Sequence, residues 1–287
     1  MLPAILFPIE ISGSSETLIG AAEEVILAGV ERITLLHVVR PEEALADPTL
    51  IEYAHTILEG WRARLVQCRP TAVESRVAVG IPWITIVDTA ARERFSCILI
   101  GSHGKGLIQR MYLGKEAETI LHSATVPVFI IRLSILRSGD ASTCTLANEQ
   151  IFRRILFAVD FSADSKKCIP FLEQMADADP GELIIVHIQD TRRLGYASPD
   201  LMAEFNRRDT QRLEELQNHF QALGFRRVTT ILRTGNAITE LLDILQGKDV
   251  SLLMVGAKGR TNMSVMTLGG VSQTLVHRSP THVFIAR

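Results

Sequence analysis

Short apolar runs alternate with longer amphipathic segments along the whole chain. The runs of the first half are rich in β-formers and show little alternation between apolar and polar positions, which is typical of strands that are covered on both faces. They lie at residues 4–9, 32–39, 74–79, 96–101 and 126–132. We therefore expect five buried strands in this half of the chain.

The segments between these runs carry the spacing of amphipathic helices. They cover roughly residues 14–29, 48–68, 81–94 and 114–124. The third begins with Pro82 in its first turn, and a long helix in the second half, 199–223, ends before Gly224. Strands and helices in strict alternation predict parallel sheets with right-handed crossovers.

The chain is an internal duplication. The stretch "ILFPIEIS" at 5–12 corresponds to "ILFAVDFS" at 155–162, which is an offset of 150 residues. From Gly80 and Gly235 onward the offset is 155, because five extra residues lie between the second and third strands of the second half. A fixed register over so many blocks predicts two similar domains, 1–135 and 151–287, joined by a polar linker at 136–150.

Composition excludes several classes of partner. The formal net charge is -2, so no overall basic field draws the protein to nucleic acid or to an anionic membrane. No apolar stretch is long enough to cross a bilayer, and the four cysteines show neither disulfide-like nor metal-ligand spacing. We expect a soluble, cytoplasmic protein with free thiols, in which any site for an anion is local.

Such a local site is indicated by a glycine motif that occurs once in each half, with the spacing G-x2-G-x9-G. Its members are Gly101, Gly104 and Gly114 in the first half, and Gly256, Gly259 and Gly269 in the second. The first glycine ends a predicted strand and the last one opens a predicted helix. Bare backbone N–H groups and the positive end of a helix dipole favour a phosphate there.

The charges inside the motif agree with this interpretation. The first copy carries four basic residues and no acid, and the second carries Lys258 and Arg260 and no acid. A single copy is equally well explained by turn glycines in a solvated basic loop, but two copies at matched positions favour a phosphate site. Neither a P-loop nor a dinucleotide fingerprint fits, because Gln109 stands where each would need a glycine.

The strand "ILFPIEIS", the strand "LLHVV", the glycine spacing and the closing "PVFIIR" together resemble the universal stress protein family over nearly the full length of both halves. The resemblance implies two tandem five-stranded parallel-sheet domains, which are doubly wound α/β sandwiches of the flavodoxin-like or adenine nucleotide alpha hydrolase-like kind. It also implies dimers paired through the last strands and, in one branch of the family, ATP or AMP in the crevice of the sheet.

In that branch an acid after the first strand and an aliphatic residue after the second-strand histidine hold the adenosine. These positions are Glu10 and Val38 in the first half, and Asp160 and Ile188 in the second. The family has Ser or Thr after the last glycine, whereas this chain has Lys115 and Gly270. Each half therefore keeps the backbone N–H groups of the glycine motif and loses a hydroxyl donor. The cations favour the first half and Asp160 favours the second, and both remain candidates.

The candidate nucleotide-binding residues therefore come from both halves. They are Pro8, Ile9, Glu10, Val38, Gly101, Ser102, His103, Gly104, Gly114, Lys115, Glu116, Ala158, Val159, Asp160, Ile188, Gly256, Ala257, Lys258, Gly259, Gly269, Gly270 and Val271.

No set of residues suited to catalysis recurs in the two halves. His37 and His187 end a buried strand, where a histidine is usually a structural hydrogen-bonding residue. We expect an adenine-nucleotide-binding regulatory or stress-response protein that binds AMP, or ATP with Mg²⁺. The alternatives are a slow ATPase and a scaffold without a ligand. The segments 126–132 and 281–287 are expected to pair in an intramolecular pseudo-dimer or in a homodimer.

Overall fold

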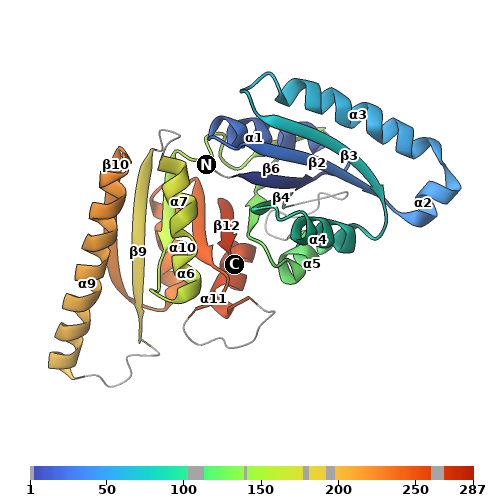
Figure 1. Cartoon of the computed structure of the whole chain (residues 1–287). Helices are drawn as coiled ribbons and strands as arrows, with labels where there is room; N and C mark the ends of the chain where they lie inside the picture. Colours follow the sequence, from blue (N-terminus) through green and yellow to red (C-terminus); the bar gives the residue numbers. More distant parts are fainter. Residues whose placement is uncertain (1–2, 103–112, 139–140, 177–180, 192–197, 260–267) are drawn as a thin grey trace. The chain divides into compact units, whose positions relative to one another are not determined.

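A computed structural model of the chain describes residues 3–102, 113–138, 141–176, 181–191, 198–259 and 268–287 (Figure 1). The chain divides into two compact units, Met1–Ile151 and Phe152–Ala286. Within the described residues each unit has a five-stranded parallel sheet with helices on it, so the predicted fold class, two tandem doubly wound α/β domains, is confirmed.

The first unit follows the predicted alternation of strands and helices, with one additional short helix, α2. Its elements are β1 (Ala4–Pro8), α1 (Ser15–Leu27), β2 (Arg32–Val39), α2 (Pro41–Ala46), α3 (Thr49–Leu65), β3 (Ala72–Val79), α4 (Pro82–Arg92), β4 (Cys97–Gly101), α5 (Lys115–Ser123) and β5 (Val128–Ile131). The strand order is β5-β4-β1-β2-β3, and all four pairings are parallel. Helices α1 and α3 pack on each other, as do α4 and α5, on opposite sides of the sheet (Figure 1).

The second unit repeats this arrangement of strands and helices. Its elements are β8 (Arg154–Ala158), α6 (Ala163–Lys166), α7 (Ile169–Ala176), β9 (Glu182–Asp190), α9 (Pro199–Ala222), β10 (Arg227–Gly235), α10 (Ala237–Gly247), β11 (Leu252–Gly256), α11 (Gly270–Arg278) and β12 (His282–Ala286). The strand order is β10-β9-β8-β11-β12. The counterpart of α1 is divided into α6 and α7, because Pro170 has no N–H to donate to the preceding turn.

In both units the first strand lies at the centre and the chain order across the sheet is 3-2-1-4-5. This differs from the flavodoxin order 2-1-3-4-5, although both are doubly wound. The direction of winding reverses between β1 and β4 in the first unit, and between β8 and β11 in the second. In open α/β sheets ligands bind beyond the carboxyl ends of the strands at this point.

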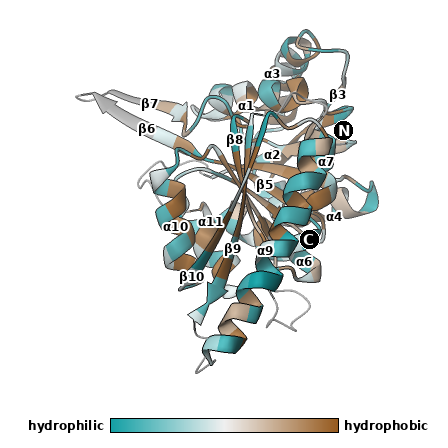
Figure 2. Ribbon diagram, turned by 90° about the vertical axis from the view of Figure 1, so that its left-hand side faces the viewer, coloured by the Kyte–Doolittle hydropathy of each residue, from teal (hydrophilic) through white to brown (hydrophobic). Residues whose placement is uncertain are grey.

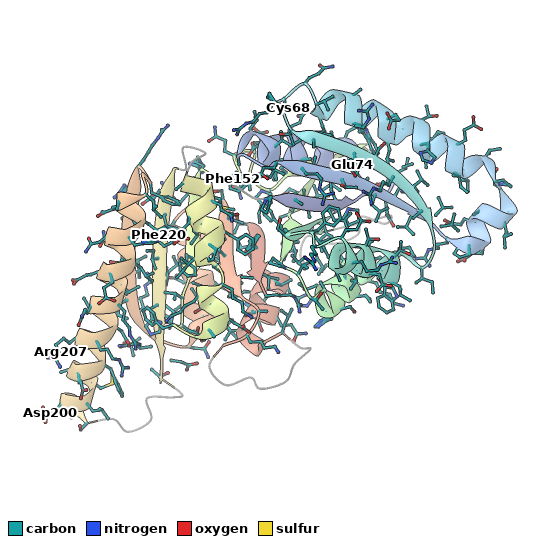
Figure 3. All side chains as sticks on the ribbon, viewed as in Figure 1. Cys68, Glu74, Phe152, Asp200, Arg207 and Phe220 are labelled. Carbon is teal, nitrogen blue, oxygen red and sulfur yellow. The ribbon has the colours of Figure 1, made fainter. Side chains whose placement is uncertain are left out.

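The strands form the cores of the two units. All residues of β11 and β12 are buried, as are those of β5, which explains why these strands are apolar apart from His282 at the start of β12. Hydrophobic residues concentrate on the strands in Figure 2, whereas α9 is largely hydrophilic on its outer side. In Figure 3 Phe220 of α9 points toward the sheet, and Asp200 and Arg207 lie on exposed parts of the helix.

A β-hairpin occupies most of the segment that the sequence predicts to be a linker. Strands β6 (Leu133–Ser138) and β7 (Ala141–Leu146) pair antiparallel, and both belong to the first unit. The hydroxyl of Thr17 on α1 donates to the carbonyl of Cys144 at 3.0 Å, which ties the hairpin to that helix. Two six-residue strands with few large apolar residues give too weak a periodicity to be recognised from the sequence.

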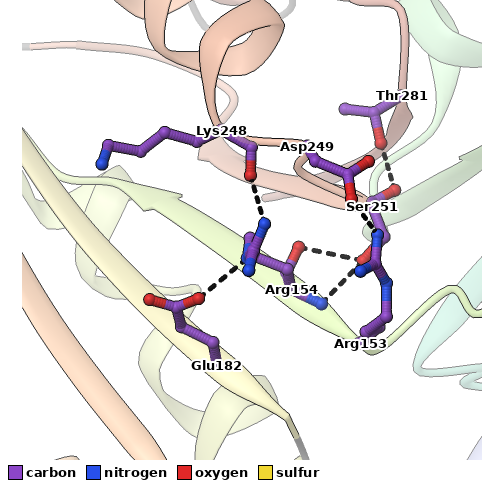
Figure 4. A network of polar contacts seen from close by, with 7 residues as sticks. All are labelled: Arg153, Arg154, Glu182, Lys248, Asp249, Ser251 and Thr281. Atoms are coloured by element: carbon purple, nitrogen blue, oxygen red, sulfur yellow. Dashed lines mark hydrogen bonds and ion pairs between the residues drawn. The ribbon is translucent and has the colours of Figure 1, made fainter.

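At the amino ends of the strands, a serine side chain makes two hydrogen bonds to the backbone of the neighbouring strand in each unit. Ser251 donates its hydroxyl hydrogen bond to the carbonyl of Arg154 and accepts one from the Arg154 N–H, both at 2.9 Å (Figure 4). Ser96 makes the same pair of contacts with Ala4 in the first unit. This pair of hydrogen bonds is therefore common to both units. It lies at the amino ends of the strands, opposite the carboxyl ends where a ligand is expected to bind.

None of the helices in the described residues has the length and apolar character needed to span a bilayer. All four cysteines are free thiols, as predicted.

Candidate functional site

The second unit has a cavity of about 450 Å³ at the carboxyl ends of β8, β9 and β11, with further walls from α9, α10 and α11. This is the point where the strand order reverses, as the doubly wound topology predicts. The volume falls within the range of small-molecule sites, roughly 300–1,000 Å³.

Asp160 lines this cavity and follows the end of β8 by two residues. Its Oδ1 accepts a hydrogen bond from the N–H of Ser162 at 3.0 Å, which fixes the carboxylate at the turn that leads into α6. A Cβ on Gly259 would come within 3.0 Å of the other carboxylate oxygen. The second glycine of the motif therefore allows the loop after β11 to approach the acid after β8.

The two ends of the glycine loop are joined by a hydrogen bond from the Gly269 N–H to the carbonyl of Ala257, at 2.8 Å. Helix α11 begins at Gly270, and no side chain within the described residues caps it. The N–H groups of its first turn, at Gly270, Val271 and Ser272, have no acceptor within the helix and lie on the cavity wall. This end of the cavity provides backbone donors, the helix dipole and Lys258, which together favour an anion.

Gly256, the first glycine of the motif, has a different role. A Cβ there would lie 2.6 Å from backbone atoms of Asp164 and Ser165 in α6. A side chain at this position is therefore excluded by the close packing of β11 against α6, and this glycine sets the shape of the cavity.

The two recurrent histidines have the structural partners expected of them. His187 Nδ1 is hydrogen-bonded to the carbonyl of Val159 at 2.7 Å, and His37 Nδ1 to that of Ile9 at 2.8 Å. The bond joins the second strand of each unit to the turn after the first strand. The ring of His187 also packs against Phe161, with 4.8 Å between centroids.

The structure brings ten of the eleven residues that the sequence assigns to the second half onto the wall of this one cavity. They are Ala158, Val159, Asp160, Ile188, Gly256, Lys258, Gly259, Gly269, Gly270 and Val271. Ala257 is not on the wall, because it is buried beneath the loop with its N–H donated to Ala286.

Several residues on the wall were not anticipated from the sequence, above all Gln189 on β9 and Asp209 on α9. The amide of Gln189 donates to Asp209 Oδ2 at 3.0 Å, and His187 Nε2 lies 3.6 Å from the same oxygen. The sequence does contain a signal for Asp209. It stands four residues before Leu213 and eleven before Phe220, so that an acid occupies the buried face of the helix.

Among the described residues of the first unit, those at the equivalent place line a small hollow of about 120 Å³. Of the candidate residues it contains Pro8, Ile9, Glu10, Val38 and Glu116. Gly101 packs against the side chain of Leu18, and Ser102 is buried with its hydroxyl accepting from the Leu133 N–H. The loop-closing bond recurs, from Gly114 N–H to Ser102 carbonyl at 2.9 Å, and Lys115 opens α5. His103 and Gly104 lie outside the described residues.

A carboxylate of the protein occupies the start of α5. Glu116 Oε1 accepts from the backbone N–H of Trp83 at 2.9 Å, and Oε2 lies 3.6 Å from the guanidinium of Arg40. The residues at the matched positions of the second unit are Val271 and Asp190, so this pair does not recur there. The hollow of the first unit is therefore lined by an acidic side chain that has no counterpart at the matched position of the second unit.

The described residues contain no cluster of three His, Cys, Asp or Glu side chains arranged to hold a metal ion. The Mg²⁺ expected to accompany ATP remains a prediction.

Comparison with known proteins gives one consistent result. The model of the Universal stress protein family matches residues 1–132 and 151–287. Universal stress protein Rv2005c of Mycobacterium tuberculosis is 23% identical over 225 residues, which cover 76% of this chain and 70% of that protein. Universal stress protein YxiE of Bacillus subtilis is 27% identical over 148 residues, which are 48% of this chain and all of YxiE.

Among solved structures, a universal stress protein from Archaeoglobus fulgidus superimposes with a TM-score of 0.73 and 22% identity. The superposition covers 99% of this chain and 98% of the archaeal one. At this level of identity the likeness supports the fold, including its tandem arrangement.

Proposed function

The chain belongs to the universal stress protein family, and from that premise we propose that it is a regulatory protein that binds an adenine nucleotide in its second unit. The observation that carries the proposal is the 450 Å³ cavity, in which an uncapped helix start faces the acid that follows the first strand.

The proposed site separates three kinds of contact along the crevice. The N–H groups at the start of α11 and the charge of Lys258 are suited to the phosphate, and Asp160 is suited to accept hydrogen bonds from ribose hydroxyls. Ile188 offers an aliphatic surface to the purine. All three kinds of contact come from residues whose positions are determined by the arrangement of strands and helices that the two units share.

The two units differ as sites, and the second is favoured on two grounds. The hollow of the first unit, at 120 Å³, is below the range of small-molecule sites, whereas the cavity of the second is within it. In addition, Glu116 adds a negative charge to the lining of the hollow in the first unit and lies 3.6 Å from its Arg40 guanidinium. Most of the basic residues of the first loop, which favoured the first half in the sequence, lie outside the described residues.

Binding is proposed in preference to turnover. Asp160, the acid nearest to the glycine loop, is held by Ser162 and is assigned to the ribose, so it is not placed to activate water at a phosphate. Gly270 supplies only its backbone N–H where the family has a hydroxyl, which removes a contact to a phosphate chain and makes AMP as suitable a ligand as ATP. Pairing of the segments 126–132 and 281–287 stays a prediction.

Isothermal titration of the ligand-stripped chain with AMP, ADP and ATP tests the proposal, with the duplication supplying the control. Asp160→Asn keeps the acceptor for Ser162 and removes the charge, and is expected to weaken binding about tenfold or more. Glu10→Gln is the same change at the matched position of the first unit and should leave affinity within about twofold. Absence of binding at millimolar nucleotide, or a larger effect of Glu10→Gln, would contradict the proposal.

A further inference from the structure

A chain of hydrogen-bonded polar groups lies at one end of the second unit's cavity, and its two central members, Gln189 and Asp209, are buried. The residues at the matched positions of the first unit are different. The residues concerned are Gln189, Arg208, Asp209 and Thr234, and at the matched positions the first unit has Val39, Tyr53, Ala54 and Val79. The register of this comparison is supported by burial, because Ala54, Leu58 and Leu65 are buried in α3 as Asp209, Leu213 and Phe220 are in α9.

The hydrogen bonds of this chain orient Asp209. The hydroxyl of Thr234 donates to Gln189 Oε1 at 3.2 Å, which turns the amide nitrogen of Gln189 toward Asp209 Oδ2, 3.0 Å away. On the other side of the carboxylate, Arg208 Nε lies 3.4 Å and an Arg212 nitrogen 3.8 Å from Oδ1. These contacts hold the carboxylate at a fixed position on the wall, with only 3% of the residue exposed.

The fold by itself does not require this acid. Burying a carboxylate carries a large desolvation cost even when it is paired, and an apolar replacement is often as stable or more so. The first unit has the same sheet and the same helix packing with alanine and valine at these places. The acid is therefore explained by what it faces, which is the cavity.

Its location fixes the part of a ligand that it can reach. Asp209 and Gln189 stand over the end of β9, the anion-binding helix start follows β11, and β8 lies between the two strands. Neighbouring strands are about 4.8 Å apart, so these ends of the cavity are separated by about 10 Å. A nucleotide with its phosphate at α11 and its ribose at Asp160 would extend its base toward Asp209.

We propose that Asp209 accepts a hydrogen bond from the exocyclic amino group of the base, so that the cavity selects a 6-aminopurine over purines with no 6-substituent or with a 6-oxo group. This inference rests on the proposed function. Gln189, Arg208 and Arg212 all direct donors at this carboxylate, so it serves as an acceptor, which favours the amino donor of adenine and disfavours the carbonyl oxygen of a 6-oxopurine. A donor matched to a buried acceptor gives stronger discrimination than an apolar surface such as Ile188 does.

The test compares affinities for AMP, for purine riboside 5′-monophosphate, which lacks the amino group, and for IMP. In the unaltered chain AMP should bind about tenfold or more tightly than either. The double variant Gln189→Val with Asp209→Ala copies the first unit and leaves no buried amide without its partner. In it the preference for AMP should fall to about one, with the affinity for purine riboside monophosphate changed less than about threefold.

Two further variants serve as a backup and as a control for this test. Asp209→Asn keeps the shape of the side chain if the double variant does not fold, and should lower the AMP preference several-fold. Thr234→Val removes the hydrogen bond that orients the Gln189 amide, at a residue outside the cavity wall, and should lower the AMP preference less than the Asp209 variants do.

An equal affinity of the unaltered chain for all three ligands, an unchanged preference in both Asp209 variants, or an equal loss in Thr234→Val would overturn the role of Asp209 while leaving nucleotide binding intact. No binding of AMP by the unaltered chain would overturn both proposals.

Discussion

The carboxylate of Glu116 accepts a hydrogen bond from the backbone N–H of Trp83 at 2.9 Å, across the start of two helices of the first unit. The same carboxylate faces Arg40. At the matched position the second unit has Val271, on the wall of a cavity almost four times as large. The two units share one arrangement of strands and helices, and they differ in the side chains at the carboxyl ends of the strands, where a ligand would bind.

Replacing Glu116 with the residue of the second unit should open the first one. In Glu116→Val the hollow loses an acid from its lining and the Arg40 guanidinium loses its carboxylate partner, so we expect nucleotide to bind beyond one equivalent per chain. Titration calorimetry with AMP measures the stoichiometry. Glu118→Val changes an acid in the same helix that is not on the wall of the hollow, and should leave one equivalent. The same stoichiometry in both variants would show that Glu116 does not block the site.

Gly270→Ser should strengthen nucleotide binding. The substitution restores the hydroxyl that the family has after the last glycine, and a Cβ at this position meets no atom within 4 Å. Affinity for ATP is expected to rise several-fold, in keeping with one added hydrogen bond. Gly60→Ser, also with open space around the Cβ but in α3 of the first unit, is the control for a general effect. An unchanged ATP affinity would mean that the missing hydroxyl does not limit binding.

Gly256→Ala should destabilise the second unit, because the added Cβ would lie 2.6 Å from the backbone of α6 and one of the two elements must move. We expect a loss of about 1–3 kcal/mol in the free energy of unfolding. Gly60→Ala, in the middle of α3 with nothing near the Cβ, should instead raise it by up to about 1 kcal/mol. Urea denaturation followed by circular dichroism distinguishes the two signs, and a neutral Gly256→Ala would refute the packing argument.

The thiols should differ in reactivity by burial. Cys97 and Cys168 are fully buried, and desolvation raises the pKa of both well above the ordinary thiol value. Cys68 and Cys144 are partly exposed, and burial raises the pKa of these thiols as well. With iodoacetamide at pH 8, peptide mass spectrometry should find Cys68 and Cys144 modified long before the other two, which should react only after unfolding. Early modification of Cys168 would be inconsistent with the fold of the second unit.

The pair Arg153 and Asp249 should contribute a pH-dependent stabilisation (Figure 4). The Arg153 hydrogen bond and charge lower the pKa of Asp249 below 3.8 in the folded protein. The contribution is therefore present above pH 3.8 and is lost as the pH falls through the lower, folded-state value. Asp249→Asn suits the positive φ of 50° at this residue and removes only the charge. The variant should be slightly less stable than the parent near neutral pH, and the difference should vanish in acid. A difference independent of pH would rule out the charge as its cause.

Much of this protein follows from the one-dimensional pattern of its residues. The periodicities predicted the five strands and the main helices of each half, and the two offsets of 150 and 155 predicted the tandem arrangement. The glycine spacing and the position of Asp160 after β8 predicted where the crevice residues of the second unit would meet. These inferences succeed because a parallel α/β sheet brings the carboxyl ends of its strands to one edge, so that position along the chain determines position in space.

The tertiary structure alone decided which unit has room for a ligand. Gln189 and Asp209 are 20 residues apart, and Arg40 and Glu116 are 76 apart, so the contact within each pair depends on how a strand, a helix and a loop pack together. The large cavity of the second unit and the small hollow of the first result from those packings. Two halves with nearly the same backbone pattern differ as sites because the direction and length of a few side chains, which no periodicity encodes, determine whether the crevice is filled by the protein or left open.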